Sequence, residues 1–301
     1  MIKSLRRIAA ACVLAGVSGL SMAGPVILGG DDLTDHGSRT AAGVNLAGWL
    51  YIEKAVSNVL SGVTRAGAKT TDIIALGSVA NSTFDAHNAG GAIGSAANVL
   101  GKTVTYIDGA IAINAFFVSL ANGTINPNML WFSGTDALNN LDAAEGAALT
   151  ANAAAINAFG ASGGGIMAHG FGSVAYGWLS ALLPGLSDSG SCSSSGATLT
   201  AAGIAAFPGL TNANVDSNAG PCHSSFVGNF GGLTTLAVDS ANRSFIIGGG
   251  AGTLIQCGQR GQPPCPARVP EPSSLLLVAI AGLGLAVTLR RRQSKTGKHT
   301  A

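Results

Sequence analysis

Four polar side chains that could do chemistry follow the first apolar run of the predicted domain. The run PVILGG, residues 25–30, leads into Asp31, Asp32, Asp35 and His36 within the segment GGDDLTDHG. Carboxylates supply oxygen ligands for a divalent cation, and a carboxylate beside an imidazole can form a proton-transfer pair. The segment therefore predicts a metal site or an acid–base site. The alternative is that the two leading aspartates cap turns and helix starts while the other two side chains are solvated.

A second candidate, His169, ends a later apolar run in the segment SGGGIMAHG. Asp85 and His87 lie in the loop after another apolar run, DIIALG. Ligands of an open parallel sheet bind where the carboxyl ends of the strands meet, so we expect these residues to converge with the first loop. The alternative for His169 is a hydrogen-bonded structural role.

The elements that would position these residues follow from the hydrophobic pattern. Continuous apolar runs, typical of strands buried on both faces, alternate with segments whose apolar residues recur at helical spacing. The pattern predicts strands at residues 25–30, 72–77, 104–107, 129–133, 165–169, 234–238 and 245–247. It predicts helices at residues 46–60, 92–100, 110–121, 141–159 and 176–183, and a short one through residue 206. This alternation favours a three-layer α/β fold with a mainly parallel sheet, helices on both faces and right-handed crossovers.

The first 23 residues have the pattern of a secretory signal peptide. Three basic residues precede an apolar run over residues 8–20. Ser21 and Ala23 are small residues at the two positions that a signal peptidase reads. We expect signal peptidase to cleave after Ala23.

The C-terminal end has the pattern of a membrane tether. The uncharged apolar residues 273–289 lie between two motifs, Pro270, Glu271 and Pro272 on one side and Arg290, Arg291 and Arg292 on the other. A helix of about 17 residues is roughly 25 Å long, just short of a typical hydrocarbon core. Positive charge resists translocation, so the arginines are expected in the cytoplasm and the preceding domain outside it.

This tail resembles the PEP-CTERM sorting signal of exported bacterial proteins, since its tripeptide, apolar segment and arginine cluster come in the same order. The resemblance implies recognition by an exosortase-type membrane enzyme that cleaves at or near the tripeptide, usually in bacteria that make exopolysaccharide. It also implies transient anchoring in the inner membrane, with the domain in the periplasm, before delivery to the cell surface or the extracellular space. The alternative is an ordinary single-pass anchor.

The sequence thus predicts five segments. They are a signal peptide at 1–23, an exported α/β domain at 24–258, a Pro/Gly linker at 259–272, a transmembrane helix at 273–289 and a basic cytoplasmic tail at 290–301. The whole chain has 16 basic and 14 acidic residues, yet residues 24–268 hold eight basic and 13 acidic ones, a net charge near −5. This balance argues against nucleic-acid binding. The glycine clusters lack the GxxxxGK pattern, and no cofactor is expected.

Four cysteines fall between the leader and the tail: Cys192, Cys222, Cys257 and Cys265. An even number in an oxidising compartment predicts disulfides. Of the three possible connectivities we favour Cys192 with Cys222 and Cys257 with Cys265, because both pairs close loops rich in Ser, Gly and Pro. Zinc binding by four thiolates is the alternative, although the spacing contains no CxxC motif.

The predicted domain resembles the flavodoxin-like group that includes class I glutamine amidotransferase-like and ThuA-like domains. The segments VILGGDD, WFSG and SGGGIMAHG carry this resemblance. In the amidotransferases the last segment would deliver a cysteine nucleophile at a strand-to-helix turn. Here it reads Ala168-His169-Gly170, which argues against glutamine hydrolysis.

Two functions remain open from the sequence. The first is a non-enzymatic protein of the envelope or extracellular matrix, associated with exopolysaccharide. The second is a secreted hydrolase or carbohydrate-active enzyme. Its site at the carboxyl edge of the sheet would use four of the candidate residues, Asp31, Asp32, His36 and His169.

Overall fold

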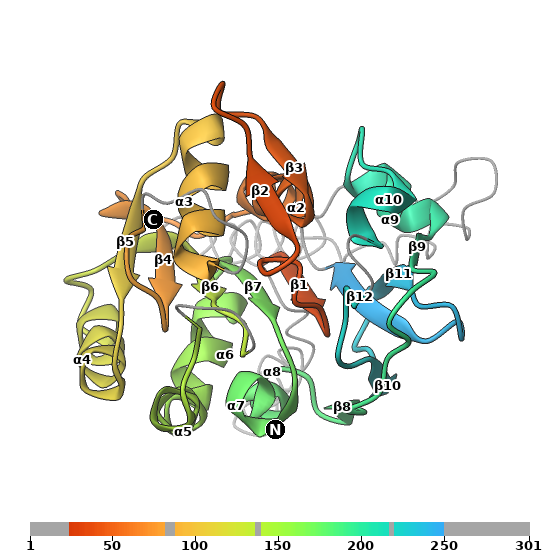
Figure 1. Ribbon diagram of the computed structural model, residues 1–301. Coiled ribbons are helices and arrows are strands. Elements are labelled where there is room, and N and C mark those ends of the chain that lie inside the picture. Colours follow the sequence, from red (N-terminus) through yellow and green to blue (C-terminus); the bar gives the residue numbers. More distant parts are fainter. Residues whose placement is uncertain (1–23, 82–87, 136–139, 217–219, 250–301) are drawn as a thin grey trace, which may run out of the picture. The chain divides into compact units, whose positions relative to one another are not determined.

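The computed structural model describes residues 24–81, 88–135, 140–216 and 220–249. The strands of its central sheet are β1 (Val26–Gly29), β4 (Thr71–Leu76), β5 (Val104–Ile107), β6 (Pro127–Phe132), β7 (Gly165–His169), β9 (Thr198–Leu199), β11 (Thr234–Val238) and β12 (Ser244–Gly249). They form one eight-stranded sheet in the order β5-β4-β6-β7-β1-β12-β11-β9 (Figure 1). The five strands from β5 to β1 are parallel, and the last three pair antiparallel.

The strand order places β1 in the middle of the sheet. The four strands β5-β4-β6-β7 follow the 2-1-3-4 part of the flavodoxin-like order 2-1-3-4-5. The fifth place is taken by β1, the first strand of the chain. Strand β1 therefore joins the parallel half, through β7, to the antiparallel half, through β12.

Helices cover both faces of the sheet. The helices on one face are α2 (Gly48–Ser61), α3 (Ala89–Leu100), α9 (Ala201–Ala206) and α10 (Asn212–Val215). Those on the other face are α4 (Ala110–Ala121), α5 (Ala143–Ala151), α6 (Ala153–Ala161), α7 (Gly172–Tyr176) and α8 (Leu179–Leu182). Alternate side chains of β1 enter different cores, since Ile27 packs on the α2 side and Leu28 on the α7 side. The predicted three-layer α/β class with a mainly parallel sheet is confirmed.

Two short antiparallel pairs lie outside the main sheet. They are β2 (Gly37–Arg39) with β3 (Asn45–Ala47), and β8 (Leu186–Asp188) with β10 (Phe226–Gly228). The sequence pattern did not predict either pair, because strands of three residues are too short to show a period.

The predicted helix at residues 141–159 is in fact two helices, α5 and α6, which meet at Asn152. The Asn152 side-chain amide donates a hydrogen bond to the carbonyl of Ala148, one turn earlier. Asparagine side chains compete with the helix backbone in this way, and helices are weakened where they do. The predicted helix at 176–183 likewise differs, since α7 ends at Tyr176 and α8 begins at Leu179.

Several predictions concern residues outside the described part of the chain. These are the signal peptide, the linker, the apolar tail segment, Asp85 and His87, and the pair Cys257 and Cys265. Among the residues that the structure does describe, no helix has both the length and the apolar character that crossing a membrane requires.

Glu145 ties together the first turns of two helices on one face of the sheet. Its Oε2 accepts a hydrogen bond of 2.8 Å from the Asp142 amide, and Asp142 Oδ1 accepts one of 2.8 Å from the Glu145 amide. This capping box starts α5. The other carboxylate oxygen, Oε1, accepts a 2.7 Å hydrogen bond from Gly109, the residue that precedes α4.

We expect Glu145→Ala to lower the free energy of unfolding by about 1–3 kcal/mol, because it removes the partner of two backbone amides at a site that is 3% exposed. Glu145→Gln keeps one amide oxygen as an acceptor and should lose less. Urea unfolding of the purified protein measures both changes. Equal midpoints for the wild type and Glu145→Ala would show that this carboxylate does not hold the helices.

Candidate functional site

The loop after β1 is fixed by backbone hydrogen bonds to distant segments. The Gly30 amide donates to the Phe245 carbonyl at 2.6 Å, and the Gly30 carbonyl accepts from the amides of His223 and Ser224 at 2.9 and 3.1 Å. The Gly170 amide donates to the Asp31 carbonyl at 2.9 Å. The residues that follow β1, β7 and the antiparallel half of the sheet are thereby held against one another.

The glycine pair before the aspartates is required by close approach. A Cβ atom at Gly29 would collide with the Oδ2 atom of Asp31, whose side chain folds back over the end of β1. A Cβ atom at Gly30 would collide with the Ser224 carbonyl. The missing side chains at Gly29 and Gly30 therefore make room for the Asp31 carboxylate and for the Ser224 backbone.

Asp31 and His169 form a sealed cluster, in which both side chains are 0% exposed. His169 Nδ1 is 3.9 Å from Asp31 Oδ1, too far for a hydrogen bond. Asp31 Oδ1 accepts a hydrogen bond from the Leu33 amide, while neither ring nitrogen of His169 has a hydrogen-bond partner among the described residues. The ring of Trp131 packs beside that of His169, with centroids 5.0 Å apart.

Burial keeps the sealed cluster uncharged at neutral pH. It raises the pKa of Asp31 to about 8 and lowers the pKa of His169 to about 3. A charged form of either group would lose its hydration without gaining an adequate partner. Asp31 is therefore a carboxylic acid at pH 7 and His169 a neutral imidazole.

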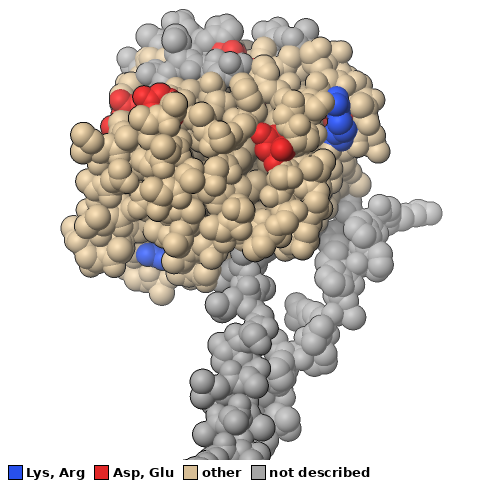
Figure 2. Space-filling model, turned by 90° about the horizontal axis from the view of Figure 1, so that it is seen from below, with Lys and Arg blue, Asp and Glu red and all other residues tan. Residues whose placement is uncertain are grey.

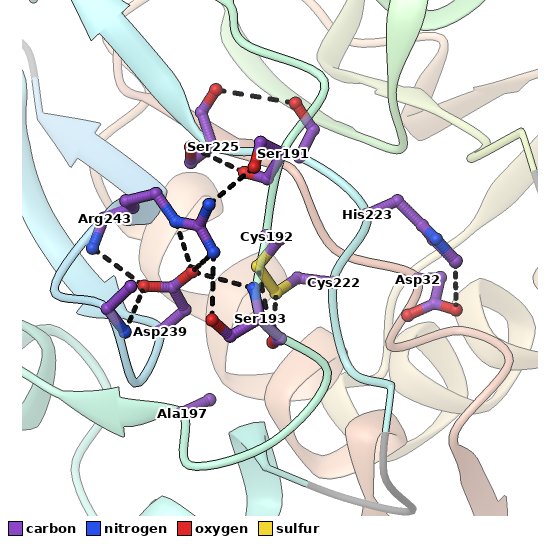
Figure 3. The surroundings of a disulfide bond; sticks show 12 residues. Asp32, Ser191, Cys192, Ser193, Ala197, Cys222, His223, Ser225, Asp239 and Arg243 are labelled. Carbon is purple, nitrogen blue, oxygen red and sulfur yellow. Dashed lines mark hydrogen bonds and ion pairs between the residues drawn. A yellow bond between two sulfur atoms is a disulfide. The ribbon is translucent and has the colours of Figure 1, made fainter.

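Asp32 belongs to a second cluster that reaches the surface. Its Oδ2 lies 3.1 Å from His36 Nε2 and 2.8 Å from His223 Nε2, and Figure 3 shows His223 pointing at this carboxylate. Side-chain exposure is 5% for Asp32, 15% for His36 and 36% for His223. The cluster thus has a buried carboxylate at its base and two imidazoles closer to solvent.

The contacts within this second cluster favour a negative charge on Asp32 and a positive charge on His36. Burial alone would raise the pKa of Asp32, but hydrogen bonds from His223 and His36 outweigh it and hold the pKa below its usual value. The hydrogen bond to Asp32 raises the pKa of His36, against the effect of burial. Asp32 is therefore an anion at neutral pH, in contrast to its neighbour Asp31.

The sequence-predicted residues are thus divided between two clusters. Asp32, Asp35 and His36 come together, with one potential ligand atom from each lying within 4.8 Å of the others. Asp31 turns instead towards His169. His223 was missed by sequence reasoning, because the segment Pro221-Cys222-His223 lies in a stretch without periodicity. Its position next to a cysteine of the predicted disulfide was the available signal.

A disulfide holds the segment that carries His223. Cys192 and Cys222 are bonded, with Cα atoms 5.9 Å apart, which confirms the first of the two predicted pairs. The segment around Cys192 is itself held by Arg243, which pairs with Asp239 in the turn between β11 and β12 (Figure 3). The Arg243 guanidinium pairs with Asp239 at 2.6 Å and donates to Ser191 and Ser193.

Few of the described Lys and Arg side chains lie on the face of the domain at the carboxyl ends of the parallel strands (Figure 2). The arrowheads of β1 and β4 point to the lower side of Figure 1, and Figure 2 views the molecule from that side. The described Lys and Arg side chains form no continuous patch on this face.

Residues 268–292 match the PEP-CTERM protein-sorting motif. The match confirms the sequence-based prediction that was made from Pro270, Glu271 and Pro272 and from the arginine cluster, and it supports the assignment as an exosortase substrate. The motif implies export and transient anchoring in a membrane. No curated protein and no solved structure matches the chain.

We expect Arg243→Ala to lower the free energy of unfolding by about 2 kcal/mol at neutral pH. It leaves the Asp239 side chain, which is 0% exposed, without its cation; partial solvent screening of the 36% exposed arginine keeps the cost below that of a fully buried pair. Burial would raise the pKa of Asp239, but its hydrogen bonds with Arg243 and Ser193 lower it overall.

The lowered pKa gives this prediction a pH dependence with a definite sign. The stabilisation by Asp239 is present above the unfolded-state pKa of about 4 and is lost as the pH falls through the folded-state value. The difference between wild type and Arg243→Ala, measured by urea unfolding from pH 7 to pH 3, should therefore shrink on acidification. A difference that stays constant over this range would contradict the assigned role of the pair.

Proposed function

We propose that the α/β domain acts outside the cytoplasm as a non-enzymatic protein of the cell envelope or extracellular matrix, in association with exopolysaccharide. The observation that carries the proposal is the PEP-CTERM motif at residues 268–292, because such a tail retains a protein at the membrane and then releases it. The leader pattern at residues 1–23 and the acidic composition of residues 24–268 agree with export. The disulfide Cys192–Cys222 is typical of oxidising compartments.

The sealed cluster supports a non-enzymatic role for part of the predicted site. Asp31 and His169 are 0% exposed, so a substrate cannot reach them in this conformation. His169 ends β7, and Gly170 and Phe171 lead from it into α7, so this turn carries no cysteine nucleophile. These two residues are better explained as a buried polar pair that shapes the end of the sheet.

Processing of the tail is tested by mass spectrometry of the mature protein from cells with and without the exosortase-type enzyme. We expect the C-terminus at or near Pro270, Glu271 and Pro272 when the enzyme is present, and an intact tail when it is absent. Replacing the tripeptide by three alanines should block release. The matched control, Pro263→Ala with Pro264→Ala in the same linker, should be processed normally. An intact tail in both kinds of cell would reduce the segment to a simple anchor.

Association with exopolysaccharide is tested by fractionating the released protein. We expect it to sediment with the polysaccharide matrix in producing cells and to remain soluble in the medium of cells that cannot make the polymer. A soluble protein in both cases would contradict the association while leaving the sorting proposal untouched.

A second candidate function, a secreted hydrolase or carbohydrate-active enzyme, is favoured only by the second cluster, that of Asp32, Asp35, His36 and His223, which we call the open cluster. Asp32 and His223 form a carboxylate–imidazole pair at 2.8 Å, and the imidazole is 36% exposed. Such a pair can move a proton. An activity found in screens of glycoside and ester substrates should fall by about 10²–10⁴-fold in His223→Gln, without a change in thermal stability. An activity that survives this substitution would place the reaction elsewhere.

A further inference from the structure

The open cluster brings together four side chains of the kinds that bind transition metals. Asp32, Asp35 and His36 come from the loop after β1, and His223 comes from a segment 191 residues after Asp32. Two imidazoles with two carboxylates are a donor set that suits zinc and related ions, whereas calcium and magnesium prefer oxygen ligands alone.

The distances from Asp32 to the two histidines are close to those of a tetrahedral site. Zinc bonds to nitrogen and carboxylate oxygen are about 2.0–2.1 Å long, which places neighbouring ligand atoms roughly 3.3 Å apart. Asp32 Oδ2 lies 3.1 Å from His36 Nε2 and 2.8 Å from His223 Nε2. The ligand atoms of Asp32, Asp35 and His36 lie within 4.8 Å of one another, and His223, which lies outside that set, would join the same ion after a rotation of its side chain.

The buried carboxylate of Asp32 has an oxygen atom that a bound cation could satisfy. Asp32 is 5% exposed, and its Oδ1 atom is buried without a hydrogen-bond partner in the described part of the chain. A buried oxygen left in this way costs free energy unless a cation or a donor compensates it. A metal ion bound by both carboxylate oxygens of Asp32 would supply that compensation, and it could be reached from solvent past the half-buried histidines.

The backbone around the cluster is fixed by contacts that do not need an ion. The Asp32 amide donates to the Pro221 carbonyl at 3.3 Å, and the Cys192–Cys222 disulfide immediately precedes His223. Little chain entropy would therefore be lost when an ion binds, as a preorganised site requires.

We propose that Asp32, Asp35, His36 and His223 bind one divalent transition-metal ion of the zinc type. The site lies at the carboxyl edge of the sheet, next to the sealed Asp31–His169 pair. The bound ion would connect the loop after β1 to the segment of His223, which follows Cys222 of the disulfide. It does not depend on whether the tail is cleaved or on whether the domain is an enzyme.

Calorimetric titration with Zn²⁺ tests the site in the full chain, purified with its disulfides intact, treated with a chelator and alkylated to block free thiols. The wild type should bind one equivalent of Zn²⁺ that His36→Ala and His223→Ala lose. Their affinity should be more than about 100-fold weaker, since even changes in residues that only support a ligand cost 10–100-fold. Asp35→Asn should weaken binding, whereas the matched control Asp108→Asn, an exposed aspartate elsewhere, should not. Wild-type binding no greater than that of the double variant His36→Ala with His223→Ala would overturn the proposal.

A thermal-shift measurement keeps the test valid if a variant folds poorly. A ligand that binds the folded state raises the melting temperature. Zn²⁺ should therefore raise it for the wild type, while Ca²⁺ at the same concentration should not. The milder variant His223→Gln should show no Zn²⁺ shift. Equal Zn²⁺ shifts in the wild type and His223→Gln, or none in the wild type, would each overturn the site.

Discussion

Backbone hydrogen bonding at the end of β1 is the constraint on which the polar edge of the sheet depends. β1 is the strand where the parallel and antiparallel halves meet, between β7 and β12. The two residues that follow it, Gly30 and Asp31, are hydrogen-bonded to the segment around His223 and to Gly170 after β7, respectively. Because Gly30 has no side chain, the Ser224 backbone can approach it closely. The geometry of both polar clusters follows from this single junction.

Much of the fold could be predicted because the elements are long and apolar enough to show their period. The predicted ranges 104–107, 110–121 and 165–169 agree with the bounds of β5, α4 and β7. The antiparallel direction of β9, β11 and β12 could not be predicted, since the sequence of a short apolar run does not indicate which strand it pairs with. The place of β1 depends on pairings with residues more than 130 positions away, which local patterns do not contain.

The location of the candidate site could be predicted from the sequence, but the contacts among its side chains could not. The rule that ligands bind at the carboxyl ends of parallel strands led to Asp32, His36 and His169. It could not say that adjacent aspartates would differ in charge. That difference arises because one carboxylate turns back over Gly29 into an enclosed space, whereas its neighbour meets two imidazoles. His223 reaches Asp32 through tertiary contacts across 191 residues, and no spacing rule spans that distance.

The disulfide beside His223 gives the polar edge a dependence on where the protein is in the cell. Cytoplasmic thiols are kept reduced, so Cys192 and Cys222 can become joined only after the chain has left that compartment. Until then the segment with His223 lacks its covalent link to the loop braced by Arg243. The open cluster is therefore completed late in the life of the chain. Translocation is thereby a step in its maturation as well as in its delivery.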